Sequence, residues 1–299
     1  RLGTKAPKKN YQKLKIPHLK TMQIKREIYY KLSPKTRLTV RKIFFFPIDV
    51  WNTITNKRNK YEPLKGDIYI GSGDFLTQGE QQLNLLKEHL LLKPNNSVLD
   101  IGCGIGRTAV ALTKYLNSEG SYEGFDVVEK GINWCNKKIN KDFPNFNFKY
   151  IPLNNDLYNN NAKEAIHFKF PYKDNSFDNV FLFSVFTHMS IEEIAHYLFE
   201  IKRVLKPGGL CLSTYFMYTS ENEKQIAHNK HCSFPINKGD YRLMNSKVKS
   251  ANIAIKDTFL DKLFENADLK KLKTIDGFWK ENITNQNSNN YQDVVILKA

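Results

Sequence analysis

The chain has 299 residues, 41% of them hydrophobic and 13% aromatic, which is enough to bury the core of one large domain. Pro and Gly are not enriched, which excludes a disordered or collagen-like chain, and the most apolar stretch, residues 43–51, is far shorter than the roughly 20 residues of a spanning helix. The net charge of +16 is uneven, because residues 1–65 hold 18 Lys or Arg and only 3 Asp or Glu. We therefore predict a basic arm over residues 1–65 and a nearly neutral domain over residues 66–299.

Hydrophobic periodicity predicts the elements in chain order. In the arm, residues 36–56 predict an amphipathic helix that breaks near Pro47. Helices are expected at 76–92, 107–117, 131–139, 191–205 and 255–266. Strands are expected at 97–101, 122–126, 146–151, 177–183, 210–216, 271–279 and 291–298, with irregular chain at 218–256 and a loop at 282–290. Strands that alternate with helices indicate an α/β fold with a parallel, doubly wound sheet and right-handed crossovers.

A glycine-rich segment joins the first expected strand to the next helix. It reads Asp100-Ile101-Gly102-Cys103-Gly104-Ile105-Gly106, and glycine lets a backbone turn sharply and approach a ligand closely. A dinucleotide fingerprint requires a further glycine where Arg107 stands, so a dehydrogenase is disfavoured. The D-x-G-x-G-x-G spacing instead resembles motif I of class I S-adenosylmethionine-dependent methyltransferases.

The resemblance implies S-adenosylmethionine as the cofactor and a mostly parallel sheet of seven strands in the order 3-2-1-4-5-7-6. It implies that the turn holds the methionine end of the cofactor. The residues that correspond are Asp100, Gly102, Cys103, Gly104 and Gly106.

The second expected strand ends in Asp126, followed by Val127. A carboxylate at this position can accept two hydrogen bonds from a ribose diol, and its separation from Asp100 suits one crossover unit. The alternative is that Asp126 caps the following helix, and the two roles are compatible. We predict the ribose contact and include Val127 in the cofactor site.

Three later segments also resemble the family. They are residues 170–178 before the fourth strand, residues 184–188 after it, and residues 205–209 before the fifth. The likeness covers roughly residues 68–298 and is closest to a bacterial type 11/25-like subgroup. It places Ser184 at the cofactor. The acidic residue that often follows the third strand is replaced by Pro152, with Asn155 or Asp156 as substitutes after a local shift.

His188 is the predicted catalytic base, because a neutral imidazole can take a proton from a hydroxyl acceptor near neutral pH. It is expected at the carboxyl edge of the sheet, where ligands bind in such folds. The alternative is a histidine that only packs under the loop. Tyr69, Phe75 and Trp279 are candidate pocket walls, although such aromatic residues more often belong to the core.

Motifs for amino methylation of DNA bases, for cytosine C5 chemistry, for protein arginine and for a catechol-type magnesium site are all missing, and no metal site is expected. The default acceptor is a small molecule, a sugar or a lipid-linked glycan hydroxyl. The alternatives are an RNA methyltransferase that uses the arm and a non-catalytic cofactor-binding protein.

The cysteine pattern favours reduced thiols in a cytoplasmic protein. The arm has three interpretations. It could bind an anionic membrane surface, which would place the protein peripherally at the inner membrane face, or it could bind a nucleic acid. The third is a solvated basic extension whose aromatic side chains pack on the domain.

Overall fold

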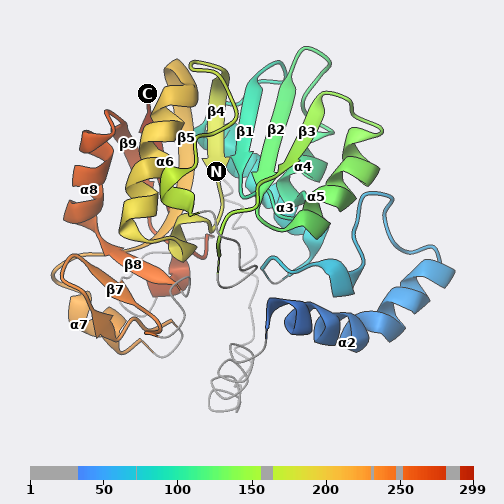
Figure 1. Cartoon of the computed structure of the whole chain (residues 1–299), viewed down its shortest axis with the longest axis horizontal. Coiled ribbons are helices and arrows are strands. Elements are labelled where there is room, and N and C mark those ends of the chain that lie inside the picture. Colours follow the sequence, from blue (N-terminus) through green and yellow to red (C-terminus); the bar gives the residue numbers. More distant parts are fainter. Residues whose placement is uncertain (1–32, 72, 156–163, 230–231, 247–251, 281–289) are drawn as a thin grey trace, which may run out of the picture.

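The structure is a computed structural model that describes residues 33–71, 73–155, 164–229, 232–246, 252–280 and 290–299 (Figure 1). Within these residues a ten-stranded sheet is flanked by helices. The helices are α2 (Pro34–Ile54), α3 (Phe75–His89), α4 (Arg107–Leu112), α5 (Glu129–Cys135), α6 (Ile191–Val204), α7 (Glu223–Ala227) and α8 (Asp257–Asn266). The strands are β1 (Ser97–Ile101), β2 (Ser121–Asp126), β3 (Phe146–Tyr150), β4 (Phe177–Leu182), β5 (Leu205–Tyr218), β6 (Ile236–Asn237), β7 (Tyr241–Leu243), β8 (Ile253–Lys256), β9 (Lys270–Ile275) and β10 (Asp293–Lys298). Single helical turns include η1 (Lys65–Asp67), η2 (Asn136–Asn140) and η4 (Phe186–His188).

The main part of the sheet has the strand order that the resemblance implies. Strands β3, β2, β1, β4 and β5 lie side by side and run parallel. Strand β10 pairs antiparallel with β5, and β9 pairs antiparallel with β10. With β9 as the sixth strand and β10 as the seventh, the order is 3-2-1-4-5-7-6. The predicted α/β fold with a doubly wound, mostly parallel sheet is confirmed.

The predicted count of seven strands is wrong, because the region expected to be irregular contributes three more. Strand β8 pairs parallel with the far end of β5, β7 pairs antiparallel with β8, and β6 with β7. These strands have only two to four residues each, too few to show an alternation of period two. The unusually long β5, with 14 residues, provides the edge on which they assemble.

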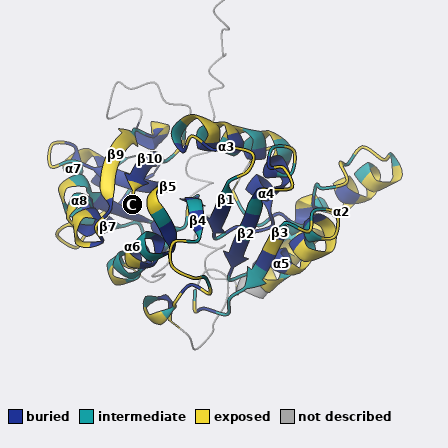
Figure 2. Ribbon diagram, turned by 90° about the horizontal axis from the view of Figure 1, so that it is seen from above, coloured by how far each residue is buried: buried dark blue, intermediate teal, exposed yellow. Residues whose placement is uncertain are grey.

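The core forms two layers because successive side chains of a strand point to opposite faces of the sheet. Leu99 and Ile101 of β1 join the layer under α6 and α8, whereas Val98 joins the layer under α3, α4 and α5. Figure 2 shows β1 and β2 as largely buried strands. With both faces covered, the carboxyl edge of the parallel strands is the place where a ligand site can form.

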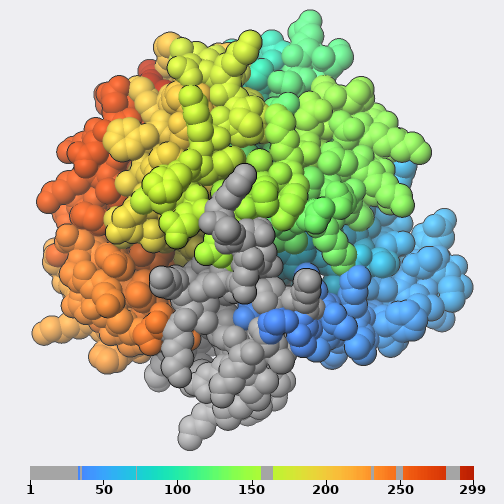
Figure 3. Space-filling view, in the orientation of Figure 1, coloured from blue at the N-terminus to red at the C-terminus, as the bar shows by residue number. Residues whose placement is uncertain are grey.

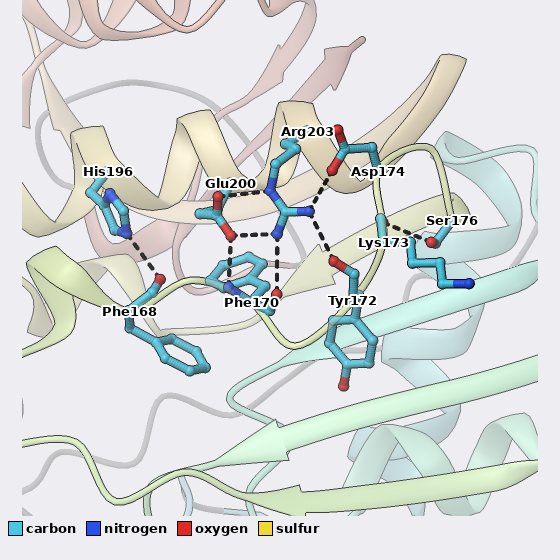
Figure 4. Close-up of polar contacts among 9 residues, drawn as sticks. All are labelled: Phe168, Phe170, Tyr172, Lys173, Asp174, Ser176, His196, Glu200 and Arg203. Atoms are coloured by element: carbon cyan, nitrogen blue, oxygen red, sulfur yellow. Dashed lines mark hydrogen bonds and ion pairs between the residues drawn. The ribbon is translucent and has the colours of Figure 1, made fainter.

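The polar face of α6 holds the segment 168–176, which leads into β4 (Figure 4). Glu200 accepts a hydrogen bond from the backbone amide of Phe170 at 2.6 Å and pairs with Arg203 at 2.6 Å. Arg203 also donates to the carbonyl of Phe170 at 3.1 Å and pairs with Asp174 at 2.8 Å. These contacts fix where β4 enters the sheet, and therefore where the loop at its carboxyl end lies.

Helix α2 begins after Ser33, whose Oγ accepts a hydrogen bond from the amide of Thr36 at 3.2 Å. The helix continues through Pro47, so the predicted break there is wrong. Pro47 removes only the hydrogen bond to the carbonyl of Ile43, and Ile43 lies on the solvent-exposed side of the helix, where water can replace the missing donor. Residues 1–32 of the predicted arm lie outside the described residues, and the division into arm and domain stays a prediction. Among the helices that the structure describes, none combines the length and apolar character that crossing a bilayer requires.

Candidate active site

A cavity of about 810 Å³ lies at the carboxyl edge of the sheet, where β1, β2 and β4 end. The segment before α3 and the residues around the start of β10 complete its wall. This volume lies in the range of about 300–1,000 Å³ that small-molecule and cofactor sites have in proteins. Seven of the nine predicted site residues line the cavity: Asp100, Gly102, Cys103, Asp126, Val127, Ser184 and His188.

The turn between β1 and α4 needs its glycines for conformation and for space. Gly102, Gly104 and Gly106 have φ values of +73°, +59° and +76°, in the left-handed region that other residues rarely adopt. A Cβ on Gly102 would come within 2.5 Å of Val185, and one on Gly106 within 2.8 Å of the Sγ of Cys135. Gly104 and Gly106, unlike the other predicted residues, are not among the cavity-lining residues. Both glycines shape the turn; Gly106 also lets α5 pack against it, and Gly104 leaves space for Ile70.

Asp126 ends β2 and is held by two backbone amides. Its Oδ2 accepts from the amide of Gly104 and its Oδ1 from the amide of Val128, both at 2.8 Å. The alternative prediction of helix capping is wrong, because Val128 is the N-cap residue of α5 and the helix has no side-chain cap. Burial raises the pKa of Asp126 to about 6, although these amides oppose the increase. A carboxylate oxygen has more than one acceptor position, so each can also accept a hydrogen bond from a ligand.

Asp100 lies deeper, one residue before the end of β1, and only 3% of it is exposed. The hydroxyl of Tyr122 donates to its Oδ2 at 2.7 Å. Burial raises the pKa of Asp100 to about 8, with a smaller contribution from the charge of Asp126. A positive ligand group nearby would favour the ionised form, so this carboxyl suits a cationic ligand. Burial also raises the pKa of the Cys103 thiol, which argues against an activated nucleophile there.

The loop after β4 contains a polar cluster that the sequence did not predict. The hydroxyls of Ser184 and Thr214 both donate to Oε1 of Gln292 at 2.8 Å, and the amide of Ser184 donates to the Thr214 hydroxyl at 2.7 Å. His188 follows in η4, where its amide donates to the carbonyl of Val185 at 2.9 Å. The cluster joins residues from three distant parts of the chain, so no local sequence pattern could reveal it.

The remaining predicted wall residues separate into cavity and core. Tyr69 lines the cavity, whereas Phe75 and Trp279 belong to buried hydrophobic clusters. Asn155, offered as a substitute contact after the third strand, also lines the cavity. Asp156 lies outside the described residues.

Comparison with known proteins identifies the family. Residues 92–285, well over half of the chain, match a family model described as a methyltransferase domain. The chain belongs to this methyltransferase family. A sterol 24-C-methyltransferase of Gibberella zeae is 26% identical over 172 residues, which cover 57% of this chain and 41% of the relative. A demethylmenaquinone methyltransferase of Bacillus cereus is 30% identical over 125 residues, covering 41% of this chain and 46% of the relative. The matched part thus spans less than half the length of these curated relatives.

Solved methyltransferase structures are similar to this chain as well. A SAM-dependent methyltransferase from Aquifex aeolicus has a TM-score of 0.42 and 18% identity, covering 76% of this chain and 99% of that one. The 1,6-didemethyltoxoflavin-N1-methyltransferase of Burkholderia thailandensis, solved with 1,6-didemethyltoxoflavin and S-adenosylhomocysteine, has a TM-score of 0.47 and 13% identity, covering 89% of this chain and 90% of that one. S-adenosylmethionine is the cofactor of this methyltransferase family, in agreement with motif I.

The charged groups of the cavity match this cofactor, which carries a carboxylate as well as positive charge. Arg107 lines the cavity, is 7% exposed and donates from Nη2 to the carbonyl of Ile70 at 2.6 Å. Its Nε is buried and has no hydrogen-bond partner in the described structure. Burial lowers the pKa of Arg107, and the charge of Asp74 opposes this effect. In the sequence, Arg107 argued only against a dehydrogenase, although an arginine directly after motif I is also a signal for an anion contact.

Proposed function

We propose that this methyltransferase transfers the methyl group of S-adenosylmethionine to a hydroxyl of a small molecule, a sugar or a lipid-linked glycan. The observation that carries the proposal is one cavity that brings together a glycine turn, two buried carboxyl groups, a buried guanidinium and a histidine. When bound, the cofactor supplies a methyl group on a positively charged sulfur.

The nucleoside end of the donor would be held by Asp126, whose carboxylate is fixed by two amides and retains acceptor capacity for the ribose hydroxyls. The amino-acid end would lie along Gly102 and Cys103, with Arg107 receiving its carboxylate and Asp100 its positive charge. Val127 and Ser184 would contribute the adjoining walls.

His188 would remove the acceptor proton. An imidazole nitrogen of His188 would take the hydroxyl proton of the acceptor, and the bound donor would supply the methyl group to the acceptor oxygen. Much of the remaining rate of methyl transfer would come from positioning the acceptor and from excluding water, because the sulfur of the donor is already a good leaving group. The polar cluster of Ser184, Thr214 and Gln292 would fix the loop that carries this histidine.

Of the proposed acceptors, the relatives' names support the small molecule. Two matched relatives are named for a sterol and for demethylmenaquinone, which favours a small apolar acceptor over RNA. The sterol relative is named for methylation at carbon, so carbon acceptors belong in the same test as hydroxyls.

Donor binding is tested with two ligands and two variants. S-adenosylhomocysteine has the whole donor frame, whereas 5′-methylthioadenosine has the nucleoside without the amino-acid tail. By calorimetry, Asp126→Asn should weaken both ligands at least roughly tenfold, as loss of charge-assisted hydrogen bonds predicts. Arg107→Gln should weaken only S-adenosylhomocysteine, by a similar factor. Retained binding of 5′-methylthioadenosine shows that the Arg107 variant is folded, and unchanged affinity of Asp126→Asn would refute the ribose contact.

Methyl transfer is tested with donor labelled in its methyl group. Panels of quinols, sterols, sugars, lipid-linked glycans and RNA serve as acceptors. We expect label in a small-molecule or lipid-linked panel, and loss of that label with His188→Gln at unchanged donor affinity. Label in RNA alone would support an RNA methyltransferase. Donor binding without label in any panel would support a non-catalytic cofactor-binding protein.

A further inference from the structure

Helix α2 presents its apolar side to solvent. Residues with helical i, i+3, i+4 spacing form one exposed stripe, in which Ile43, Phe44, Trp51 and Ile54 are 70%, 72%, 61% and 76% exposed. The other members of this stripe are Val40, Pro47 and Val50. Phe46, 65% exposed, lies beside it. We call these eight residues the outer face of α2.

The opposite side of the helix carries its polar contacts with the domain. Asp49 is buried, and its two oxygens accept hydrogen bonds from the amides of Lys65 and Gly66 at 2.7 and 2.9 Å. Arg37 is buried as well. This orientation is the reverse of an ordinary surface helix, in which the apolar stripe faces the core.

The exposed charges of α2 itself are all positive. Asp49 is the single acidic residue in α2, and it is turned inward, so the exposed part of the helix has no negative charge. Lys42 and Lys57 border it. Lys42 is 53% exposed although it pairs with Asp67 at 3.6 Å, and Lys57 is exposed as well. A surface that combines exposed aromatic side chains with exposed lysines is complementary to an anionic lipid surface.

The helix is also joined to the cavity wall. Asp49 holds η1, and within η1 Asp67 pairs with Lys42 of the helix at 3.6 Å and also with Lys130 of α5. The chain then continues directly into Tyr69, Ile70 and Gly71, which line the cavity. Figure 1 shows α2 below the carboxyl edge of the sheet. In Figure 3 its atoms, in blue, lie at the lower right of the molecular surface.

We propose that the outer face of α2 binds the surface of an anionic lipid bilayer. The helix has 21 residues and is about 30 Å long, which lets it lie flat at the level of the headgroups. Trp51 and the phenylalanines would enter the interface, where aromatic side chains are favoured. The lysines would face the lipid phosphates. RNA bound to the outer face would contact the lysines but leave the apolar side chains exposed. A second copy of the chain bound there would place lysines of the two copies near one another.

The test uses the full chain and vesicles of phosphatidylcholine with or without phosphatidylglycerol. We expect sedimentation with the anionic vesicles only, weakened by salt. We also expect a blue shift of tryptophan fluorescence that is absent in a variant without Trp51, because the chain has three Trp residues. The disrupting variant carries three changes in the outer face: Phe44→Ser, Phe46→Ser and Trp51→Ser. The matched control carries three changes at exposed apolar residues elsewhere: Leu91→Ser, Phe199→Ser and Leu272→Ser.

The disrupting variant should lose at least tenfold in vesicle partitioning, and the control variant should not. Absence of binding to anionic vesicles at low salt would overturn the proposal, as would equal binding by both variants. Evidence for another occupant of the outer face would also overturn the proposal. Such evidence would be a dimer of the full chain that is absent in the disrupting variant, or RNA binding that is lost in that variant. Vesicle binding that is seen only after residues 1–32 are removed would count against it as well. The proposal is independent of methyl transfer, because the disrupting variant should bind S-adenosylhomocysteine normally.

Discussion

Helices α2 and α6 are both amphipathic, but they present opposite sides to the domain. In α6, Ile194, Leu198 and Ile201 are fully buried in the core. In α2, residues with the same spacing are the most exposed apolar side chains of the helix. Each helix uses one carboxylate to hold a neighbouring backbone segment: Glu200 holds the lead-in to β4, and Asp49 holds η1.

The comparison shows that amphipathicity and burial are separate properties. A periodic apolar stripe becomes core only where another apolar surface is available to cover it, as the sheet covers α6. An apolar stripe that stays exposed marks an interaction surface. The predictions below test this contrast, and they concern stability rather than activity.

The largest effect is expected when one side chain of each stripe is truncated to alanine. Leu198→Ala should lower the free energy of unfolding by about 2–5 kcal/mol, because it removes a buried side chain and leaves a cavity. Phe44→Ala should change it by less than about 0.5 kcal/mol, because that side chain is 72% exposed. Urea denaturation of both variants measures the difference. A large loss in Phe44→Ala would show that the outer face of α2 is packed.

An intermediate effect on stability is expected when the carboxylate of Asp49 or of Glu200, each of which binds a neighbouring backbone amide, is removed. Asp49→Ala and Glu200→Ala should each cost about 1–3 kcal/mol, because each leaves a backbone amide without its acceptor. The variants Asp49→Asn and Glu200→Gln retain one acceptor oxygen and should cost less. Thermal melts of the four variants provide the ranking. If Asp49→Ala leaves the melting temperature unchanged, the polar side of α2 does not hold the helix on the domain.

The contribution of Glu200 should also depend on pH. Burial disfavours its charged form, but hydrogen bonds from Arg203 and from the amide of Phe170 outweigh burial and hold the pKa of Glu200 below its ordinary value of 4.5. A lowered pKa stabilises the fold while the group is ionised, so this contribution is full above pH 4.5 and is lost as the pH falls through the lowered value. The stability difference between wild type and Glu200→Gln should therefore shrink on acidification. Denaturation curves of wild type and Glu200→Gln at neutral and at acidic pH measure this difference. A larger difference at acidic pH would contradict the prediction.

The smallest effect is expected for the exposed ion pair between α2 and η1. Lys42 and Asp67 lie 3.6 Å apart, and the lysine side chain is 53% exposed. Lys42→Gln should change the free energy of unfolding by less than about 1 kcal/mol, since solvent screens such pairs. A loss comparable with that of Asp49→Ala would mean that charge, rather than backbone hydrogen bonding, attaches the helix.

Part of the cavity lining could be predicted because its residues are neighbours in the sequence. Asp100 lies near the end of β1, Gly102 and Cys103 lie in the turn that follows, and Asp126 ends the next strand of the same crossover unit. Thr214 and Gln292 could not be predicted, because they meet Ser184 only when β5 and β10 pair. Arg107 could have been included, since it directly follows the glycine turn.

The sequence by itself determined the alternation of strands and helices, the glycine turn and the amphipathic character of α2 and α6. These features depend on local periodicity and backbone conformation. Only the tertiary structure decided that β6, β7 and β8 extend the sheet and that the apolar stripe of α2 faces outward. Very short strands carry no periodic signal, and a stripe does not specify its partner. Which surface covers it depends on contacts between residues far apart in the chain.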